Sequence, residues 1–155
     1  MTQPDAPDCL ICQEQDGRVP IPGGHLIAND HVVAFHLPPM PQAPEPYLGY
    51  LFVTSRRHVP SFAELDPAEA AAMGVAISKL SAALKAEGAE PVYIAGIGHA
   101  VPHLHVHLIP RWPETPAEIS WIKVYEWEGA RRGNGEVVRE WTIRLRNRLE
   151  SLDRL

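Results

Sequence analysis

The sequence predicts an α+β fold, in which an antiparallel meander sheet is accompanied by one long helix and a C-terminal helix. The order of the patterns is the first observation: strands, a long helix, further strands and a last helix, rather than repeated βαβ units. The second is that His103, His105 and His107 alternate with apolar residues, which is the period of a half-buried strand. The third is the length of 155 residues, which suits one domain with a sizeable core.

Composition indicates a globular chain and narrows the range of partners. Hydrophobic residues make up 45% and charged residues 21% of the chain. No apolar run approaches the roughly 20 residues that span a bilayer. The net charge of −5 argues against binding nucleic acid or a membrane surface, although a local positive site could still hold a small anion. Residues 1–5 lack the features of a signal peptide, so we expect a cytoplasmic protein.

Residues 1–25 are rich in proline and glycine, and we expect them to form an irregular arm that needs something to hold it in place. This arm carries the only two cysteines of the chain, Cys9 and Cys12. In a reducing compartment, the C-x-x-C spacing favours a metal half-site or a redox pair over a structural disulfide. A free thiol pair is the simpler alternative.

Two apolar runs predict the first strands of the sheet, at residues 31–36 and 48–54. The segment between them, residues 37–46, contains several prolines and is expected to be a loop. Arg56 and Arg57 follow the second strand. They form either a solvated edge or a contact for a polyphosphate.

The long helix is predicted to begin after Asp66. This residue can cap the helix, Pro67 suits the first helical position, and Glu69 completes a capping box. The apolar residues that follow cluster along one side, and Gly88 is expected to end the helix.

The second half of the sheet and the last helix follow in order. Residues 91–95 are the third predicted strand, residues 96–98 form a turn, and the histidine strand begins after Pro102. Residues 111–135 are rich in Trp, Pro and Gly and are expected to form a long ordered loop. Residues 136–152 carry apolar side chains at helical spacing and form the terminal helix.

Three alternating imidazoles on one face of a strand point to chemistry, and two arrangements are open. A single metal could be held by all three, but a strand rises about 3.3 Å per residue, which separates His103 from His107 by roughly 13 Å. The alternative is a division of roles, in which one imidazole attacks, a second donates a hydrogen bond to the substrate and a third serves the structure. Histidine is largely neutral near pH 7 and can attack phosphorus without activation. A simple polar strand face is the bland alternative.

Residues 102–111 resemble the signature of the histidine triad (HIT) superfamily. Residues 49–58 resemble the strand and basic turn that precede a histidine in these proteins, and residues 9–12 resemble the C-x-x-C of their zinc-bearing branch. A weaker similarity involves Ala34 and Phe35, followed by residues 41–44. The resemblance covers about residues 9–111 and implies a HIT-like fold for a single domain of residues 1–155.

The resemblance implies a nucleotide phosphohydrolase or nucleotidyl transferase that forms a nucleotidyl-histidine intermediate at the α-phosphate. His105 would be the nucleophile, and His107 would contact a phosphate oxygen and stabilise charge in the transition state. Gly98 and His99 would lie in a turn that offers backbone N–H groups to the phosphate. A nucleotide or dinucleoside polyphosphate would be the substrate, magnesium could accompany a polyphosphate, and the protein would be a homodimer.

The zinc-bearing branch also implies a structural zinc site. Its ligands would be Cys9, Cys12, His58 and His103, a closed set of two thiolates and two imidazoles. Zinc would attach the arm of residues 1–25 to the domain and would remove His103 from the free imidazoles.

Three departures from the family pattern concern substrate contacts. Leu37 stands where many members have an acidic residue for the ribose hydroxyls, and Ala100 stands where many have serine. The stretch from Phe35 to His58 is also longer than usual. A catalytically weak nucleotide-binding or sensor module of the same fold is therefore the first alternative. A metalloenzyme that uses the triad as ligands is the second.

The remaining histidines and the tryptophans are given ordinary roles. We expect His25, His31 and His36 to be surface or loop residues. The four tryptophans are expected to fill the core or an interface, although one of them could stack on a base.

Overall fold

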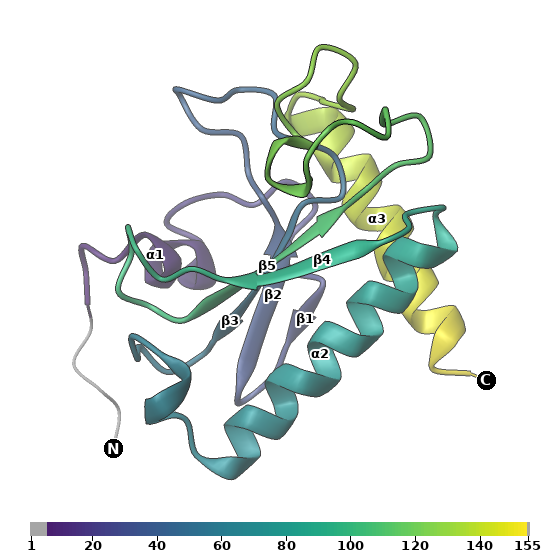
Figure 1. Ribbon diagram of the computed structural model, residues 1–155. Coiled ribbons are helices and arrows are strands. Elements are labelled where there is room, and N and C mark those ends of the chain that lie inside the picture. The colour runs from purple at the N-terminus through teal and green to yellow at the C-terminus, as the bar shows by residue number, and fades with distance from the viewer. Residues whose placement is uncertain (1–5, 155) are drawn as a thin grey trace.

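The computed structural model describes residues 6–154, which form one antiparallel sheet with three helices (Figure 1). The strand order across the sheet is β1-β2-β3-β5-β4. The strands are β1 Ile27–Ala28, β2 Val32–His36, β3 Leu51–Ser55, β4 Val92–Gly96 and β5 His105–Pro110. The helices are α1 Leu10–Asp16, α2 Pro67–Ala86 and α3 Gly135–Leu152, and two short 3-10 turns lie at Phe62–Glu64 and Trp121–Lys123.

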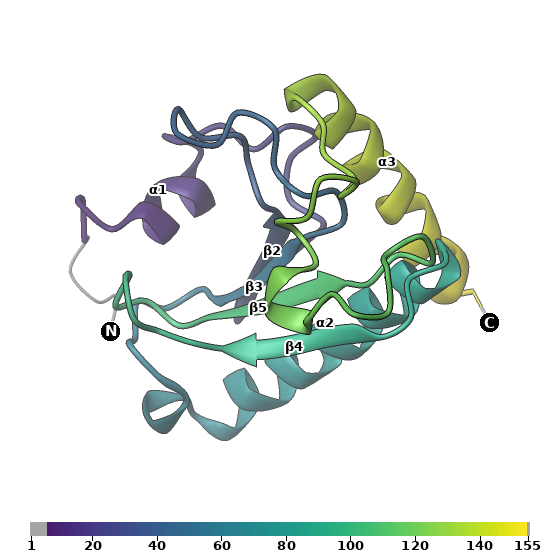
Figure 2. The ribbon, with the colours of Figure 1, turned by 45° about the horizontal axis from the view of Figure 1, so that its top comes forward.

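The sheet is covered on both faces near β2, where α1 and α2 lie on opposite sides (Figure 2). Val32 and Ala34 of β2 belong to the main core, which α2 closes. Val33 and Phe35, which point the other way, pack with Ile11 of α1 in a second, small cluster. Burial on both faces explains why this strand is a continuous apolar run rather than an alternating one.

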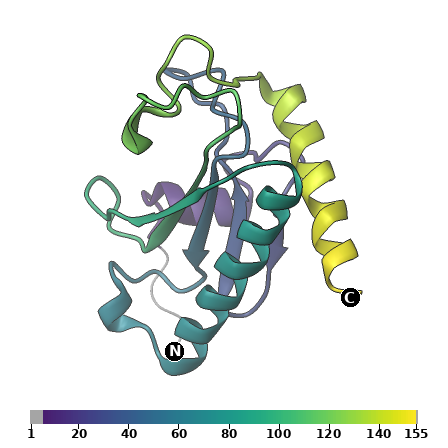
Figure 3. The ribbon, with the colours of Figure 1, turned by 45° about the vertical axis from the view of Figure 1, so that its right-hand side comes forward.

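The two long helices form as the sequence predicts. The Asp66 carboxylate accepts a hydrogen bond from the Glu69 amide, and the Glu69 carboxylate accepts one from the Asp66 amide, so the capping box is confirmed. Helix α3 begins after Asn134, whose side chain caps it, and runs alongside α2 (Figure 3). Trp141 of α3 packs against the buried Trp112 of the predicted loop.

Three boundaries differ from the sequence prediction. The arm is not irregular throughout, because α1 forms between Cys9 and Gly17, where a backbone φ of 85° ends the helix. Residues 1–5 of the predicted arm lie outside the described residues. The second strand starts later than predicted because Gly49 adopts a φ of 85°, and a Cβ atom there would lie 2.8 Å from the Trp112 ring. In the third case, β5 begins at His105, so His103 precedes the strand.

None of the helices within residues 6–154 has the length and apolar character needed to cross a membrane.

Candidate active site and metal cluster

His105 and His107 lie side by side on the face of the sheet that α1 partly covers, which we call the triad face. Their ring centroids are 5.0 Å apart. Phe52 of β3 pairs with His107 in the strand register. Its ring makes edge-on contacts with both imidazoles, with ring centroids 5.5 Å from His105 and 4.9 Å from His107. The apolar residues Val106 and Leu108 point into the main core, as the alternation predicts.

The main chain fixes the orientation of His105. Its Nδ1 lies 2.6 Å from the carbonyl oxygen of His103. A carbonyl oxygen only accepts, so Nδ1 carries the hydrogen and donates it. In the neutral ring, Nε2 of His105 therefore keeps its lone pair, which is the state that a nucleophile requires.

His107 faces a hydroxyl group rather than a carbonyl oxygen. Its Nδ1 lies 2.8 Å from the hydroxyl of Tyr50, which has no other hydrogen-bond partner among residues 6–154. Burial raises the pKa of the Tyr50 phenol, so the hydroxyl keeps its proton and is able to donate it to Nδ1. In that orientation Nε2 of His107 carries the ring hydrogen, and this atom is buried with no partner among the described residues. Burial, with a smaller contribution from His105, lowers the pKa of His107 to about 4, so the ring is a neutral hydrogen-bond donor.

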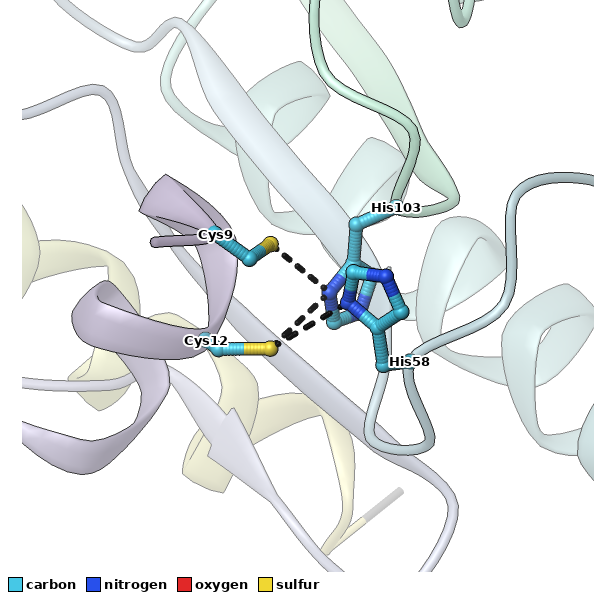
Figure 4. Close-up of side chains that lie close together, drawn as sticks. All are labelled: Cys9, Cys12, His58 and His103. Carbon is cyan, nitrogen blue, oxygen red and sulfur yellow. Dashed lines mark hydrogen bonds between the residues drawn. The ribbon is translucent and has the colours of Figure 1, made fainter. Parts of the chain in front are cut away.

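A second cluster of side chains lies beyond the start of β5, where α1 meets the loops after β3 and β4 (Figure 4). It consists of Cys9, Cys12, His58 and His103, whose ligand atoms all lie within 4.8 Å of one another. Nδ1 of His103 is 3.4 Å from each of the two sulfurs, and Nδ1 of His58 is 3.4 Å from Sγ of Cys12. Around a tetrahedral zinc with bonds of about 2.3 Å to sulfur and 2.0–2.1 Å to nitrogen, neighbouring S and N atoms are about 3.5 Å apart. The four residues therefore fit a zinc ion.

Hydrogen bonding and burial prepare His103 as a metal ligand. Its Nε2 donates to the Ser55 carbonyl oxygen at 2.7 Å, which leaves the Nδ1 lone pair directed at the sulfurs. Burial chiefly, together with the nearby His58 and His105, lowers the pKa of His103 to about 4 and keeps the ring neutral. Burial also raises the pKa of the Cys12 thiol to about 12, so only a bound cation would hold it as a thiolate.

Helix α1 connects this cluster to the triad strands. Nε2 of Gln15 donates to the Thr54 hydroxyl and to the Ser55 carbonyl, both at 2.8 Å. Thr54 is the register partner of His105, and the Ser55 carbonyl also accepts from His103. The helix that carries both cysteines is thus anchored to the strand beside the nucleophile candidate.

The predicted phosphate turn lies at the same end of the sheet. Gly98 and His99 are exposed, and Gly98 has a φ of 61°. Among residues 6–154, no hydrogen bond or ring contact joins either residue to His105 or His107. Ala100 and Pro102 line a cavity of about 410 Å³ that reaches His58 and Cys9.

Sequence reasoning missed several residues of this region. Tyr50, the Ser55 carbonyl and Gln15 carry no local motif. The fold brings the first two to His107 and His103, and helix α1 brings Gln15 to β3. His36 is not a surface residue, because it is fully buried in β2. Its Nδ1 donates to the Leu37 carbonyl at 2.8 Å, and its Nε2 accepts from the Gly49 amide at 2.9 Å.

Arg57 is paired with the long helix, because its guanidinium forms two hydrogen bonds with the carboxylate of Glu69, at 2.8 and 2.7 Å. Trp112 and Trp141 are core residues as expected, whereas Trp121 is 46% exposed beside Tyr93.

Comparison with known proteins gives a consistent result. The model of the HIT domain family matches residues 19–114. The structure is similar to a Zn-bound histidine triad family protein from Mycobacterium smegmatis, with 19% identity, a TM-score of 0.71 and coverage of 97% of this chain and 99% of that one. It is also similar to a hypothetical histidine triad nucleotide-binding protein from Sulfolobus tokodaii strain 7, with 19% identity, a TM-score of 0.69 and coverage of 94% and 95%.

A protein from Streptococcus mutans UA159 shares 28% identity over 70% of this chain and 68% of its own, with a TM-score of 0.55. No curated protein matches the chain. The solved structures confirm the predicted α+β arrangement of an antiparallel sheet with a long helix and a C-terminal helix, and the sheet has five strands where four were predicted.

Proposed function

Because the chain belongs to the HIT domain family, we propose that it binds a nucleotide on the triad face and acts as a nucleotide phosphohydrolase or nucleotidyl transferase. One observation carries the proposal. Two neighbouring imidazoles lie side by side, with the lone pair of His105 at Nε2 and the Tyr50 hydroxyl at Nδ1 of His107, and a Tyr50 hydroxyl that donates leaves the N–H group of His107 at Nε2. That pairing suits attack on phosphorus next to a hydrogen-bond donor for the developing negative charge.

The first chemical step uses both histidines. Nε2 of His105 attacks the α-phosphorus, a P–N bond forms, and the bond from phosphorus to the leaving group breaks. The His103 carbonyl, which accepts from Nδ1 of His105, stabilises the positive charge that the ring acquires. Nε2–H of His107 donates to a phosphoryl oxygen, and the backbone N–H groups of the turn at Gly98 and His99 serve the other oxygens.

The second step restores the enzyme. The oxygen of water, or of an acceptor alcohol or phosphate, attacks the same phosphorus and the P–N bond breaks. The product is a nucleoside monophosphate or a transferred nucleotide, and His105 returns to the neutral state with its hydrogen on Nδ1. Water and other acceptors attack the same nucleotidyl-histidine intermediate, so this mechanism covers both a hydrolase and a transferase.

The metal cluster has a structural role in this proposal. Cys9, Cys12, His58 and His103 would hold zinc in a closed four-ligand site, which supplies cross-linking of the arm to the domain rather than Lewis-acid chemistry. The similar histidine triad family protein from Mycobacterium smegmatis is Zn-bound, which supports this choice of metal. Magnesium would enter only with a polyphosphate substrate, because sulfur and imidazole ligands do not suit it.

We further propose that the single domain of residues 1–155 assembles as a homodimer through β4. This strand lies at the edge of the sheet, and within residues 6–154 its only strand partner is β5. Phe62, Ile94 and Ile97 expose 52%, 55% and 62% of their surface around it. An apolar edge strand favours pairing with a second copy. Ile94→Lys should give a monomer in sedimentation experiments, whereas unchanged sedimentation would contradict this interface.

The decisive test of the mechanism is the variant His105→Asn. We expect nucleoside monophosphate release to fall by at least about 10⁴-fold, because the nucleophile is lost. Dinucleoside polyphosphates, nucleoside phosphoramidates and sugar nucleotides form the substrate panel, and zinc content confirms that the variant is folded. His31→Asn, a histidine outside the site, is the matched control. Full activity in His105→Asn would overturn the mechanism.

A trapped intermediate separates this proposal from its alternative. Rapid acid-free quenching of the wild type, followed by peptide mass spectrometry, should find a nucleotidyl group on His105. Nucleotide binding with neither turnover nor adduct would favour the catalytically weak binding module, for which Leu37 and Ala100 are the supporting departures.

A further inference from the structure

A pocket of about 310 Å³ adjoins the triad face at the end farther from the metal cluster. It lies between the proline-rich loop before β3 and the long loop of residues 111–134. Its lining includes four aromatic side chains, which are Tyr47, Tyr50, Phe52 and Tyr125. We call it the aromatic pocket.

The aromatic pocket is continuous with the two site histidines. Phe52 contacts both imidazoles, and Tyr50, which holds His107 through its hydroxyl, lies 5.7 Å from Phe52 between ring centroids. Tyr125 follows at 5.8 Å from Tyr50. A ligand with its phosphorus at His105 could therefore extend past His107 along these rings into the pocket.

The rim of the pocket carries one acidic and one basic side chain beside the aromatic lining. Glu45 and Arg132 both line it and are both exposed. Nη2 of Arg132 donates to the Tyr125 carbonyl at 2.6 Å, which orients the guanidinium next to the pocket. Leu37 contributes an apolar surface to the same pocket.

We propose that the aromatic pocket binds a nucleobase of the substrate. A base offers a planar ring for stacking against tyrosines and an edge with both acceptors and donors, which suit Arg132 and Glu45. This inference rests on the proposed function, since it places the phosphorus at His105. The base belongs either to the nucleotide that is transferred or to a nucleotide that leaves, and both present the same chemistry.

Tyr125 is the residue to test, because its phenol makes no hydrogen bond to a site histidine. Tyr125→Leu removes the ring but keeps apolar bulk, and Tyr125→Phe, which keeps the ring, is the matched control. The affinities of AMP and ribose 5-phosphate are measured in the His105→Asn background, where no turnover interferes. The two probes share phosphate and ribose and differ only in the base.

If the pocket binds the base of the transferred nucleotide, Tyr125→Leu lowers the AMP to ribose 5-phosphate affinity ratio roughly tenfold, and Tyr125→Phe leaves it unchanged. If it binds the base of a leaving nucleotide, the ratio is unchanged. In the active enzyme, kcat/KM for diadenosine polyphosphate then falls roughly tenfold relative to adenosine phosphoramidate. An unchanged ratio together with equal effects on both substrates would overturn the inference.

The design separates this inference from the mechanism. Base-dependent binding in His105→Asn, together with no turnover by the wild-type protein, would uphold the pocket and contradict the proposed chemistry. Turnover that is indifferent to Tyr125→Leu would uphold the chemistry and contradict the pocket.

Discussion

The two ends of the histidine run use the same side chain in opposite ways. At the metal end, His103 donates from Nε2 to the Ser55 carbonyl and directs Nδ1 at two sulfurs. At the other end, His105 donates from Nδ1 and leaves Nε2 open, whereas Nδ1 of His107 lies 2.8 Å from the Tyr50 hydroxyl, a group that can donate to it. The spacing is identical, so the partner of the other ring nitrogen determines what each histidine can do.

His103 connects the two ends, so that a change at the metal end affects His105 but not the reverse. The side chain of His103 belongs to the metal cluster, while its carbonyl oxygen orients His105. Damage at the metal end should therefore reach the nucleophile, whereas a change at His105 should leave the metal end intact.

Loss of a thiolate should have the largest effect. We expect Cys12→Ser to lose zinc and to lower the free energy of unfolding by on the order of 5 kcal/mol, because folding of the arm is coupled to metal binding. Activity should fall too, since the position of His103 is no longer fixed. Zinc analysis and urea unfolding measure both effects, with His105→Asn as the control that keeps its zinc. A fully zinc-loaded Cys12→Ser protein would contradict the assignment of ligands.

His36 provides a buried histidine that serves the fold alone. Burial lowers its pKa to about 4, below the roughly 6.5 of the unfolded chain. The unfolded state then binds more protons between these values, so stability is lost as the pH falls through this window. We expect His36 to remove about 2 kcal/mol of unfolding free energy between pH 7 and pH 5.

The variant His36→Asn isolates that contribution. It should be less stable than the wild type at pH 7, and its unfolding free energy should decline less steeply toward pH 5. Parallel pH profiles for the two proteins would show that the buried ring does not titrate as described.

Tyr50→Phe should have the smallest effect and the most specific one. It retains the ring contacts but removes the hydroxyl that holds His107 with its hydrogen on Nε2. We expect kcat to fall about tenfold, which corresponds to the roughly 1.4 kcal/mol of one hydrogen bond. Steady-state kinetics on the best panel substrate test this, and an unchanged kcat would remove Tyr50 from the site.

Much of the fold follows from the sequence, because the long elements carry strong local signals. The capping box at Asp66 and the alternation after His105 are confirmed, and α2 and α3 end close to where the pattern predicts. Helix α1 and β1 were not predicted because they have only seven and two residues. Their stability comes from contacts with β2 rather than from local propensity.

The site was only partly predictable, for a different physical reason. The family resemblance predicts four zinc ligands, and the structure brings all four side chains together. The roles of the nitrogens could not be predicted, because they depend on two carbonyl groups and on Tyr50, which is 57 residues from His107 in the chain. A backbone carbonyl has no sequence signature, and only the folded structure shows which histidine donates to it.

The two tautomers are tested most directly by a side-chain ¹⁵N correlation spectrum of the zinc-loaded protein at neutral pH, with each histidine assigned by substitution. We expect neutral His105 to be protonated at Nδ1 and neutral His107 at Nε2. A spectrum in which His105 carries its hydrogen on Nε2, or in which both rings share one tautomer, would contradict this assignment.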